Sequence, residues 1–395
     1  MSGLLTLEEA LQHILARAGR LPFETVPLEK ALGRVVAEPP LARVDLPPFA
    51  SSAMDGFAVR AEETPGTLPI AARVAAGRPA SAPLPPGTAA EIATGGTVPD
   101  GANAVVPMEQ TAEHDNQVEI GEPVDPGAHI RPRGGDVREG DIVVPIGARV
   151  GAAQIGALAA AGIAEIRCSR RPRVAVLATG SELRAPGETL EHGQIFESNG
   201  AMIAATLGDV ADVELLPVAR DEERTHREAL ERGLAADVLV TSGGVSMGPH
   251  DLVRRVGSEL GVQEVFWGVA IKPGRPLSFG VRDETLVFGL PGNPVSSLVG
   301  ALLFVRPALL ARQGLAEPGP DFEVGRATSE LRRNARRDEF VRARRTADDR
   351  GIALEPVAGQ ESHMIVRAAS ADALVHVPRG VGEIASGETV RYLSI

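Results

Sequence analysis

Three short apolar runs in the middle of the chain each lead into a glycine turn. Apolar runs of this length, bounded by turn residues, are typical of buried strands. A strand, a glycine turn and a helix start together form a geometry that binds anions on backbone N–H groups. Three such turns within the length of one domain predict an α/β sheet whose loops share one crevice at the carboxyl ends of the strands. The runs with their turns are VAVLATGSE (174–182), VLVTSGG (238–244) and LVFGLPGNPVSS (286–297).

Helical periodicity appears on both sides of these runs. Thr6 and Glu9 form a capping-box pattern before an amphipathic stretch that needs a partner surface for its apolar face. Further helices are predicted at residues 152–161, 197–207 and 223–234, and Asn293 with Pro294 has the pattern of a helix start.

The remaining patterns divide the chain into four units. Short alternating runs between turn clusters predict a β-rich unit over residues 45–140 and a small barrel or sandwich over 319–395. Residues 168–318 hold the α/β sheet. Residues 1–44 and 141–167 then form one discontinuous N-terminal α/β domain, into which the β-rich unit is inserted. The predicted fold class is therefore a multidomain α/β plus β protein.

Composition narrows the class of protein. At 395 residues the chain is too long for one ordinary core. Its formal charge of −12, with no long basic block, argues against a nucleic-acid partner. No run reaches the roughly 18 apolar residues that a membrane span requires. A single cysteine, Cys168, excludes an internal disulfide and suits a reducing compartment, so we expect a cytoplasmic protein.

Two turns in the β-rich unit carry polar residues. Asp55 precedes Gly56 at a tight turn that enters a strand, and Thr94 places a hydroxyl beside two glycines. Further on, Arg131 and Asp136 lie around another glycine pair. Each cluster has a plain interpretation as a solvated turn. The alternative for the second cluster, in which Arg131 and Arg133 lie two positions apart near Asp136, is a clamp that holds an oxyanion and a metal ion.

One loop between the second and third apolar runs concentrates positive charge. Only two of the chain's 40 basic residues are lysines, Lys30 and Lys272. Lys272 lies three positions before Arg275 in a loop stiffened by prolines and a glycine. Two cations held in such a loop favour an anion site over a solvated turn.

Taken together, these segments resemble the molybdopterin molybdenumtransferase family, whose animal relative is the E domain of gephyrin. The resemblance covers nearly the whole chain, and the segments follow the family's order. Phe57, Gly96 and Arg275 stand where the family commonly has Tyr, Ala and Lys. The segments are PPFASSAMDGFAV, ATGGTVPDGANAVV, IRPRGGDV, VAVLATGSEL, IFESNG, VLVTSGGVSMGPHD, AIKPGRPLSFG and GLPGNPVSS.

The resemblance implies an elongated subunit with a three-layer α/β domain like the molybdopterin-binding fold and a C-terminal β-barrel. It also implies a homodimer formed through the N-terminal domain, with each active site shared between one subunit's α/β crevice and the other's β-rich unit. The substrates would be molybdate and adenylylated molybdopterin, and the products molybdenum-loaded molybdopterin and AMP. Mg²⁺ would be the cofactor. Contact with the molybdopterin adenylyltransferase would follow from that substrate.

The resemblance also assigns roles to residues. The metal ligands would be Glu182 and Asp251. The catalytic set would be Asp55, Thr94, Asp136, Glu182, Asp221, Asp251 and Lys272. Substrates would be bound by Arg131, Thr179, Gly180, Ser181, Ser242, Gly243, Gly244, Ser246, Gly248, Lys272, Arg275, Pro291, Gly292, Asn293, Pro294, Ser296 and Arg342.

Two other functions are compatible with parts of the pattern. A non-enzymatic scaffold is possible because the gephyrin fold also binds peptides, but the acids and cations of the site are all present here. A nucleotide pyrophosphatase could use the same α/β unit. The MDG, TGG and RPRGGD segments argue against it, because they lie outside that unit.

Overall fold

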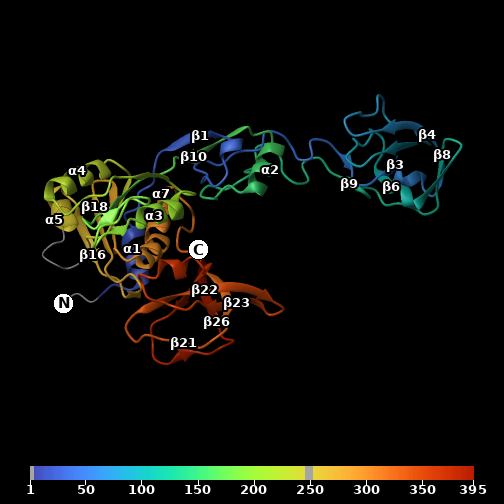
Figure 1. The fold of residues 1–395 in the computed structure, drawn as a ribbon. Helices are drawn as coiled ribbons and strands as arrows, with labels where there is room; N and C mark the ends of the chain where they lie inside the picture. The colour runs from blue at the N-terminus through green and yellow to red at the C-terminus, as the bar shows by residue number, and fades with distance from the viewer. Residues whose placement is uncertain (1–3, 245–251) are drawn as a thin grey trace.

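The computed structural model describes residues 4–244 and 252–395. The subunit is elongated (Figure 1), with an α/β unit and a β-barrel at one end and a separate β unit at the other. A narrow middle section joins the two ends. The predicted class, multidomain α/β plus β, is confirmed.

The middle section is a small unit built from two distant parts of the chain. Strand β1 (Phe23–Pro27) pairs antiparallel with β10 (Glu165–Ser169), and α2 (Ala152–Ala160) packs beside the 3-10 turn η1 (Leu28–Lys30). Its hydrophobic cluster includes Cys168, and burial raises the pKa of this thiol to about 11. A protonated, buried thiol has a packing role.

The distal β unit is organised around one six-stranded sheet with its own hydrophobic clusters. Gly56 begins β3, where a Cβ atom would lie 2.0 Å from the carbonyl oxygen of Val106 on the neighbouring strand. Only glycine allows this approach. In order across the sheet the strands are β6 (Ala104–Pro107), β3 (Gly56–Val59), β5 (Ala89–Ile92), β4 (Gly66–Val74), β8 (Gln117–Ile120) and β7 (Thr111–His114); nearby lie β2 (Ser51–Ser52), β9 (Ile130–Arg131), η2 (Ala61–Glu63) and η3 (Met108–Gln110).

The α/β unit contains a six-stranded sheet in which the three apolar runs lie side by side. Strands β14, β11, β15 and β19 are parallel, whereas β18 and β16 complete the sheet antiparallel. Parallel strands with buried faces read as continuous apolar runs, which is why the sequence revealed them. The strands in order are β14 (Asp212–Leu215), β11 (Arg173–Ala178), β15 (Val238–Ser242), β19 (Thr285–Leu290), β18 (Ser278–Arg282) and β16 (Gln263–Trp267).

Helices cover both faces of this sheet (Figure 1). The N-terminal helix α1 (Leu7–Leu15) has the predicted capping box, and its buried residues Leu7, Ala10 and Ile14 join the core of the α/β unit. That core is the partner surface that the apolar face of this amphipathic helix requires. The other helices are α3 (Asn199–Leu207), α4 (Glu223–Gly233), α5 (Leu252–Glu259), α6 (Pro294–Gly300), the π-helical turn η4 (Ala301–Val305) and α7 (Arg306–Arg312).

One described helix is long and apolar enough to cross a membrane by length and composition. It is the continuous segment Pro294–Arg312, made of α6, η4 and α7. Most of it, 72%, is buried inside the fold, where it packs in the α/β core. A buried core helix passes the same test as a span, so this helix is explained by packing.

The C-terminal unit is a closed five-stranded barrel, in agreement with the prediction for this segment. Strand β17 (Ile271–Lys272) of the α/β unit adds to the barrel by pairing in parallel with β22. This pairing fixes the lysine loop against the C-terminal unit. The barrel strands are β20 (Glu323–Ala327), β22 (Asp338–Asp348), β23 (Gly351–Pro356), β24 (Ala373–Val377) and β26 (Thr389–Ser394), accompanied by β21 (Leu331–Arg332), β25 (Glu383–Ile384) and α8 (Ile365–Ala368).

The described residues enclose six hydrophobic clusters, one of which joins the α/β unit to the barrel through Phe340, Leu374 and Leu393, and the division of the chain into four domains stays a proposal. We keep the predicted boundaries as a proposal, with α1 packed on the α/β core although residues 1–44 were assigned to the N-terminal domain.

Candidate functional site

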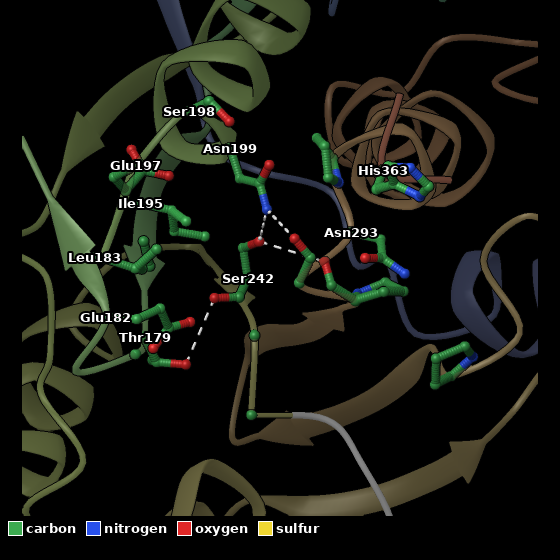
Figure 2. Close-up of a pocket in the computed structure, with 18 of the residues that line it drawn as sticks. Thr179, Glu182, Leu183, Ile195, Glu197, Ser198, Asn199, Ser242, Asn293 and His363 are labelled. Atoms are coloured by element: carbon green, nitrogen blue, oxygen red, sulfur yellow. Dashed lines mark hydrogen bonds between the residues drawn. The ribbon is translucent and has the colours of Figure 1, made fainter. Parts of the chain in front are cut away.

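A cavity of about 1060 Å³ opens at the carboxyl ends of β11, β15 and β19, where the three glycine turns meet. Figure 2 shows its walls, which converge on Ser242 at the end of β15. Its position is the crevice that the apolar runs predicted. Predicted residues in the lining are Thr179, Gly180, Glu182, Asp221, Ser242, Gly243, Gly244, Arg275, Pro291, Gly292, Asn293 and Pro294.

Backbone hydrogen bonds hold the three turns together. The N–H of Thr179 donates to the carbonyl of Ser242 at 3.0 Å, and the N–H of Gly243 donates to the carbonyl of Leu290 at 3.1 Å. Gly243 has a φ of +92°, and a Cβ atom there would lie 2.7 Å from the carbonyl oxygen of Thr179. Glycine is therefore required both by the backbone angle and by the space.

Two carboxylates flank the first turn. The N–H of Ser181 donates to Asp221 at 3.1 Å, and the N–H of Asp221 donates to the Ser181 hydroxyl at 3.0 Å. The Glu182 carboxylate folds over Gly180, where an added Cβ atom would lie 2.5 Å from Oε2. Glu182 and Asp221 both line the cavity and both are exposed to solvent.

Glu182 and Asp221 are carboxylates that a divalent cation in the cavity could use as ligands. Within residues 4–244 and 252–395 no group of three metal-ligating side chains comes together. Mg²⁺ needs fewer protein ligands, because it commonly uses one or two carboxylates and completes its shell with phosphates and water. Glu182 and Asp221, two exposed carboxylates in the lining of a cavity with room for a phosphorylated ligand, fit that pattern. Asp251, the other predicted ligand, lies outside the described residues, as do Ser246 and Gly248.

A buried polar network closes the floor of the cavity (Figure 2). The Asn199 side-chain N–H groups donate to the Ser242 hydroxyl and to the carbonyl of Gly292, each at 2.8 Å. Ser242 lies 3.2 Å from the Ser297 hydroxyl, which donates in turn to the carbonyl of Pro291. The network ties the start of α3 to the second and third turns. Asn199 belongs to the IFESNG segment, and nothing in that segment's sequence indicates its role in this network.

Comparison with known proteins agrees with this arrangement along the whole chain. Family profiles match three consecutive segments: the MoeA N-terminal region (domain I and II) at residues 5–162, a probable molybdopterin-binding domain at 175–311, and the MoeA C-terminal region (domain IV) at 324–395. The chain is 39% identical to molybdopterin molybdenumtransferase 2 of Mycobacterium tuberculosis, with 92% of this chain and 93% of the relative covered. It is 35% identical to molybdopterin molybdenumtransferase of Haemophilus influenzae, with 98% of each covered.

The chain belongs to the MoeA family. The crystal structure of the molybdopterin biosynthesis MoeA protein from Pyrococcus horikoshii OT3 superimposes with a TM-score of 0.85 at 28% identity, covering 99% of this chain and 100% of that one. This member of the MoeA family is accordingly a transferase with a role in molybdenum cofactor biosynthesis.

The cation loop of this MoeA-family chain divides between the cavity and the barrel. Arg275 lines the cavity and is exposed. Lys272 is not part of the lining; its ammonium lies 3.2 Å from both carboxylate oxygens of Glu339 on β22. Ser296 is buried in the first turn of α6, and Ser181 is exposed with its hydroxyl accepting from the N–H of Asp221; neither belongs to the cavity lining. Their substrate contacts remain predictions.

Arg342 has a different environment from the one expected of a molybdate ligand. Its side chain is 1% exposed, and its guanidinium donates to the carbonyls of Gly359, Glu361 and Met364. Burial lowers its pKa. In the described structure Arg342 anchors the loop that carries His363 to the cavity wall, and it does not line the cavity itself.

The predicted residues of the distal β unit lie far from the cavity within one subunit (Figure 1). Asp55 accepts a hydrogen bond of 2.6 Å from the N–H of Thr94, and this bond lowers the pKa of the Asp55 carboxyl. Both residues are exposed, and Asp55 borders a separate hollow of about 460 Å³. Arg131 lies on β9 and Asp136 follows it, both exposed. The structure thus pairs Asp55 with Thr94, but it does not bring them to Glu182.

The cavity also contains residues to which the sequence analysis assigned no role. Trp267, the only tryptophan of the chain, lies at its edge at the end of β16. His363 lines the cavity from the C-terminal unit. Nothing in the sequence around Trp267 or His363 indicates that either residue lies at the site. The others are Ala178, Leu183, Ile195, Phe196, Glu197, Ser198, Asn199 and Pro276.

Proposed function

We propose that this protein is a molybdenum insertase, which uses molybdate and adenylylated molybdopterin to form molybdenum-loaded molybdopterin and releases AMP. The observation that carries the proposal is the cavity, because it combines exposed backbone turns, two carboxylates and Arg275 at the carboxyl ends of parallel strands. Those groups suit a ligand with several phosphates.

The chain's own groups would perform binding and positioning. Glycine at positions 180, 243 and 292 lets a ligand approach the backbone without a side chain in the way. The N–H groups of Gly180 and Gly243 already donate to the carbonyls of Ala219 and Leu290, so these two glycines would shape the site and not donate to the ligand. Arg275 would hold an oxyanion at the rim. Glu182 and Asp221 would hold Mg²⁺, which when bound offsets charge on the phosphates of the nucleotide.

We further propose that the active site is completed by a second copy of this chain. The supporting observation is that Asp55 and Thr94 are exposed at the far end of the subunit from the cavity. A partner subunit could present them. The narrow N-terminal unit also exposes large apolar side chains, which is typical of a surface covered by another protein. These are Phe23, Leu32, Leu41, Ile142 and Ile146.

A cytoplasmic location and contact with a molybdopterin adenylyltransferase remain parts of the same proposal. The contact follows from the substrate, because an adenylylated pterin must be supplied by an enzyme that transfers AMP. The location follows from the single cysteine, which suits a reducing compartment.

The deciding experiment measures AMP release by the purified protein from adenylylated molybdopterin and Mg²⁺, with and without molybdate. We expect release to depend on molybdate and molybdenum to stay on the pterin. Release that is indifferent to molybdate would favour a pyrophosphatase, and binding without release would favour a scaffold. The Glu182→Ala variant serves as the control for a reaction in this cavity, since its carboxylate lines the wall.

A further inference from the structure

The orientation of the Asn199 amide is fixed by its surroundings. The carbonyl of Gly292 can only accept a hydrogen bond, so the side-chain atom 2.8 Å from it must be the nitrogen. The same nitrogen also donates to the Ser242 hydroxyl. The oxygen Oδ1 therefore points the other way, and the assignment does not depend on a choice between amide flips.

This oxygen has no hydrogen-bond donor among the described residues. Asn199 is only 9% exposed, yet it belongs to the cavity lining, and Figure 2 shows its oxygen directed away from Ser242. A buried acceptor without a donor is costly, and native structures normally pair such groups. A ligand N–H or O–H group would supply the missing bond, whereas a phosphate oxygen could not, because it only accepts at neutral pH.

Two apolar side chains line the same cavity as this oxygen. Strand β12 (Leu183–Arg184) pairs in parallel with β13 (Ile195–Phe196), and the pairing places Leu183 opposite Ile195. The N–H of Ile195 also donates to the carbonyl of Glu182 at 3.0 Å. Figure 2 shows Leu183 and Ile195 on the same side of the cavity as Asn199.

The Ile195 side chain remains uncovered in the subunit, and Leu183 is half-buried. Ile195 is 54% exposed, although it lines the cavity and sits on a strand held at both ends by backbone bonds. An exposed apolar surface inside a concave polar site is typical of the place where the flat face of a ring binds. Sugar hydroxyls and phosphates would lose hydration there without compensation.

We propose that Asn199 Oδ1, with Leu183 and Ile195, forms a subsite for an amino-substituted heteroaromatic ring: the ring face packs on the two apolar side chains and a ring amino N–H donates to Asn199. The inference rests on the proposed function, whose substrate carries two such rings, a pterin and an adenine. Either ring has the required chemistry. The subsite is occupied by one of them, and binding measurements with each ring alone distinguish the two.

The experiment titrates the full-length protein with adenosine and, separately, with free pterin, neither of which carries a phosphate. Binding is measured by calorimetry. Fluorescence of Trp267, the only tryptophan and a lining residue, reports whether the compound enters this cavity. We expect one of the two rings to bind. Its analogue without the amino group, purine riboside or 4-hydroxypteridine, should bind about tenfold more weakly because the N–H donor to Asn199 is lost.

Serine substitutions of exposed apolar side chains complete the test. Ile195→Ser should weaken binding of the same ring about tenfold while leaving ribose 5-phosphate binding unchanged. Leu215→Ser is the matched control, because Leu215 is 50% exposed on β14 but lies outside the cavity lining. The proposal is overturned if neither ring binds, if the amino-free analogue of the ring that binds does so as tightly as its parent, or if Ile195→Ser binds the ring as tightly as Leu215→Ser.

The outcome is independent of turnover. Ring binding without molybdate-dependent AMP release would keep the subsite and reject the insertase reaction, whereas AMP release with unchanged behaviour of Ile195→Ser would do the opposite.

Discussion

The two places that hold predicted site residues are built in opposite ways. At the cavity, three turns from distant parts of the sequence are locked by backbone bonds and by the buried Asn199–Ser242 network. In the distal β unit, Asp55 and Thr94 share one hydrogen bond on an exposed surface. The first place is assembled by the fold of one subunit. The surface around Asp55 and Thr94 holds these two residues in position, but within one subunit it lies far from Glu182 and the cavity.

This difference shows that a residue can belong to a recognisable sequence motif without lining the cavity. Asp55 and Glu182 come from equally recognisable segments, yet only one of them lines the large cavity. A composite site across two subunits would reconcile the two, because an exposed carboxylate with a lowered pKa stays ionised and ready to contact a partner's ligand. The predictions below test that comparison.

The largest effect is expected from Gly243→Ala. The new methyl group would lie 2.7 Å from the Thr179 carbonyl at a φ of +92°, so the first and second turns must separate. We expect AMP release to fall about 100-fold, since displacements near 1 Å at a reacting centre have effects of that size. Gly187→Ala is the matched control: its φ is +94°, but a Cβ atom there meets nothing within 4 Å. Equal activity of the two variants would contradict a preassembled cavity.

The next largest effect concerns the proposed sharing of sites. Subunits carrying Asp55→Ala and subunits carrying Glu182→Ala should each be nearly inactive alone. After random mixing, half of the dimers are mixed and one of their two sites is intact, so about a quarter of wild-type activity should return. Mixing Glu182→Ala with Asp221→Ala should restore nothing, because both residues belong to the same side of the site. A lack of recovery in the first mixture would place Asp55 outside a shared site.

A smaller effect is expected at the cation loop. Lys272→Ala should raise the molybdate concentration needed for half-maximal AMP release roughly tenfold, the equivalent of one charge-assisted contact. Its ion pair with Glu339 is half-exposed and adds little stability, so folding should be preserved. Lys30→Ala is the control, since Lys30 is the only other lysine and lies in η1. An unchanged molybdate dependence would indicate that Lys272 has only a structural role, through its contact with the barrel.

The smallest effect tests the joint between the two regions. Asp209 accepts from Arg306 of the α/β unit and from Arg149 of the N-terminal unit, and the Arg306 bond chiefly lowers its pKa to about 2 from an ordinary value of 3.8. A lowered pKa contributes stability above about pH 4 that is lost as pH falls towards 2. Asp209→Asn should therefore lower the unfolding free energy by less than about 1 kcal/mol at pH 7 and remove part of the acid dependence. Thermal unfolding at pH 3 and pH 7 measures this, with the exposed Asp283→Asn as control.

The sequence revealed the parts of the fold whose physics is local. Buried parallel strands appear as apolar runs, and the capping box at Thr6 marks the start of α1, so these elements were predictable. The contact of α1 with the α/β core was not, because an amphipathic stripe states only that a partner exists. For the site, the glycine turns indicated where chain segments converge.

Asn199 and Arg342 show where sequence reasoning stops. Both are single polar residues whose role depends on distant backbone carbonyls, those of Gly292 and of residues 359–364. A carbonyl leaves no trace in the sequence, so neither the acceptor left open on Asn199 nor the burial of Arg342 could be derived. Only coordinates place these groups together.

The two-stranded ribbon of β1 and β10 has a mechanical consequence for the whole molecule. A ribbon of two strands resists stretching along its length but bends and twists more easily than a wide sheet. The distal β unit lies beyond this ribbon from the cavity, so a change in ribbon twist would shift Asp55 relative to the α/β unit without altering the cavity itself. Tension on the β1–β10 ribbon, applied by a protein that binds the distal unit, would therefore change the distance between the Asp55 surface and the cavity with which it is proposed to act.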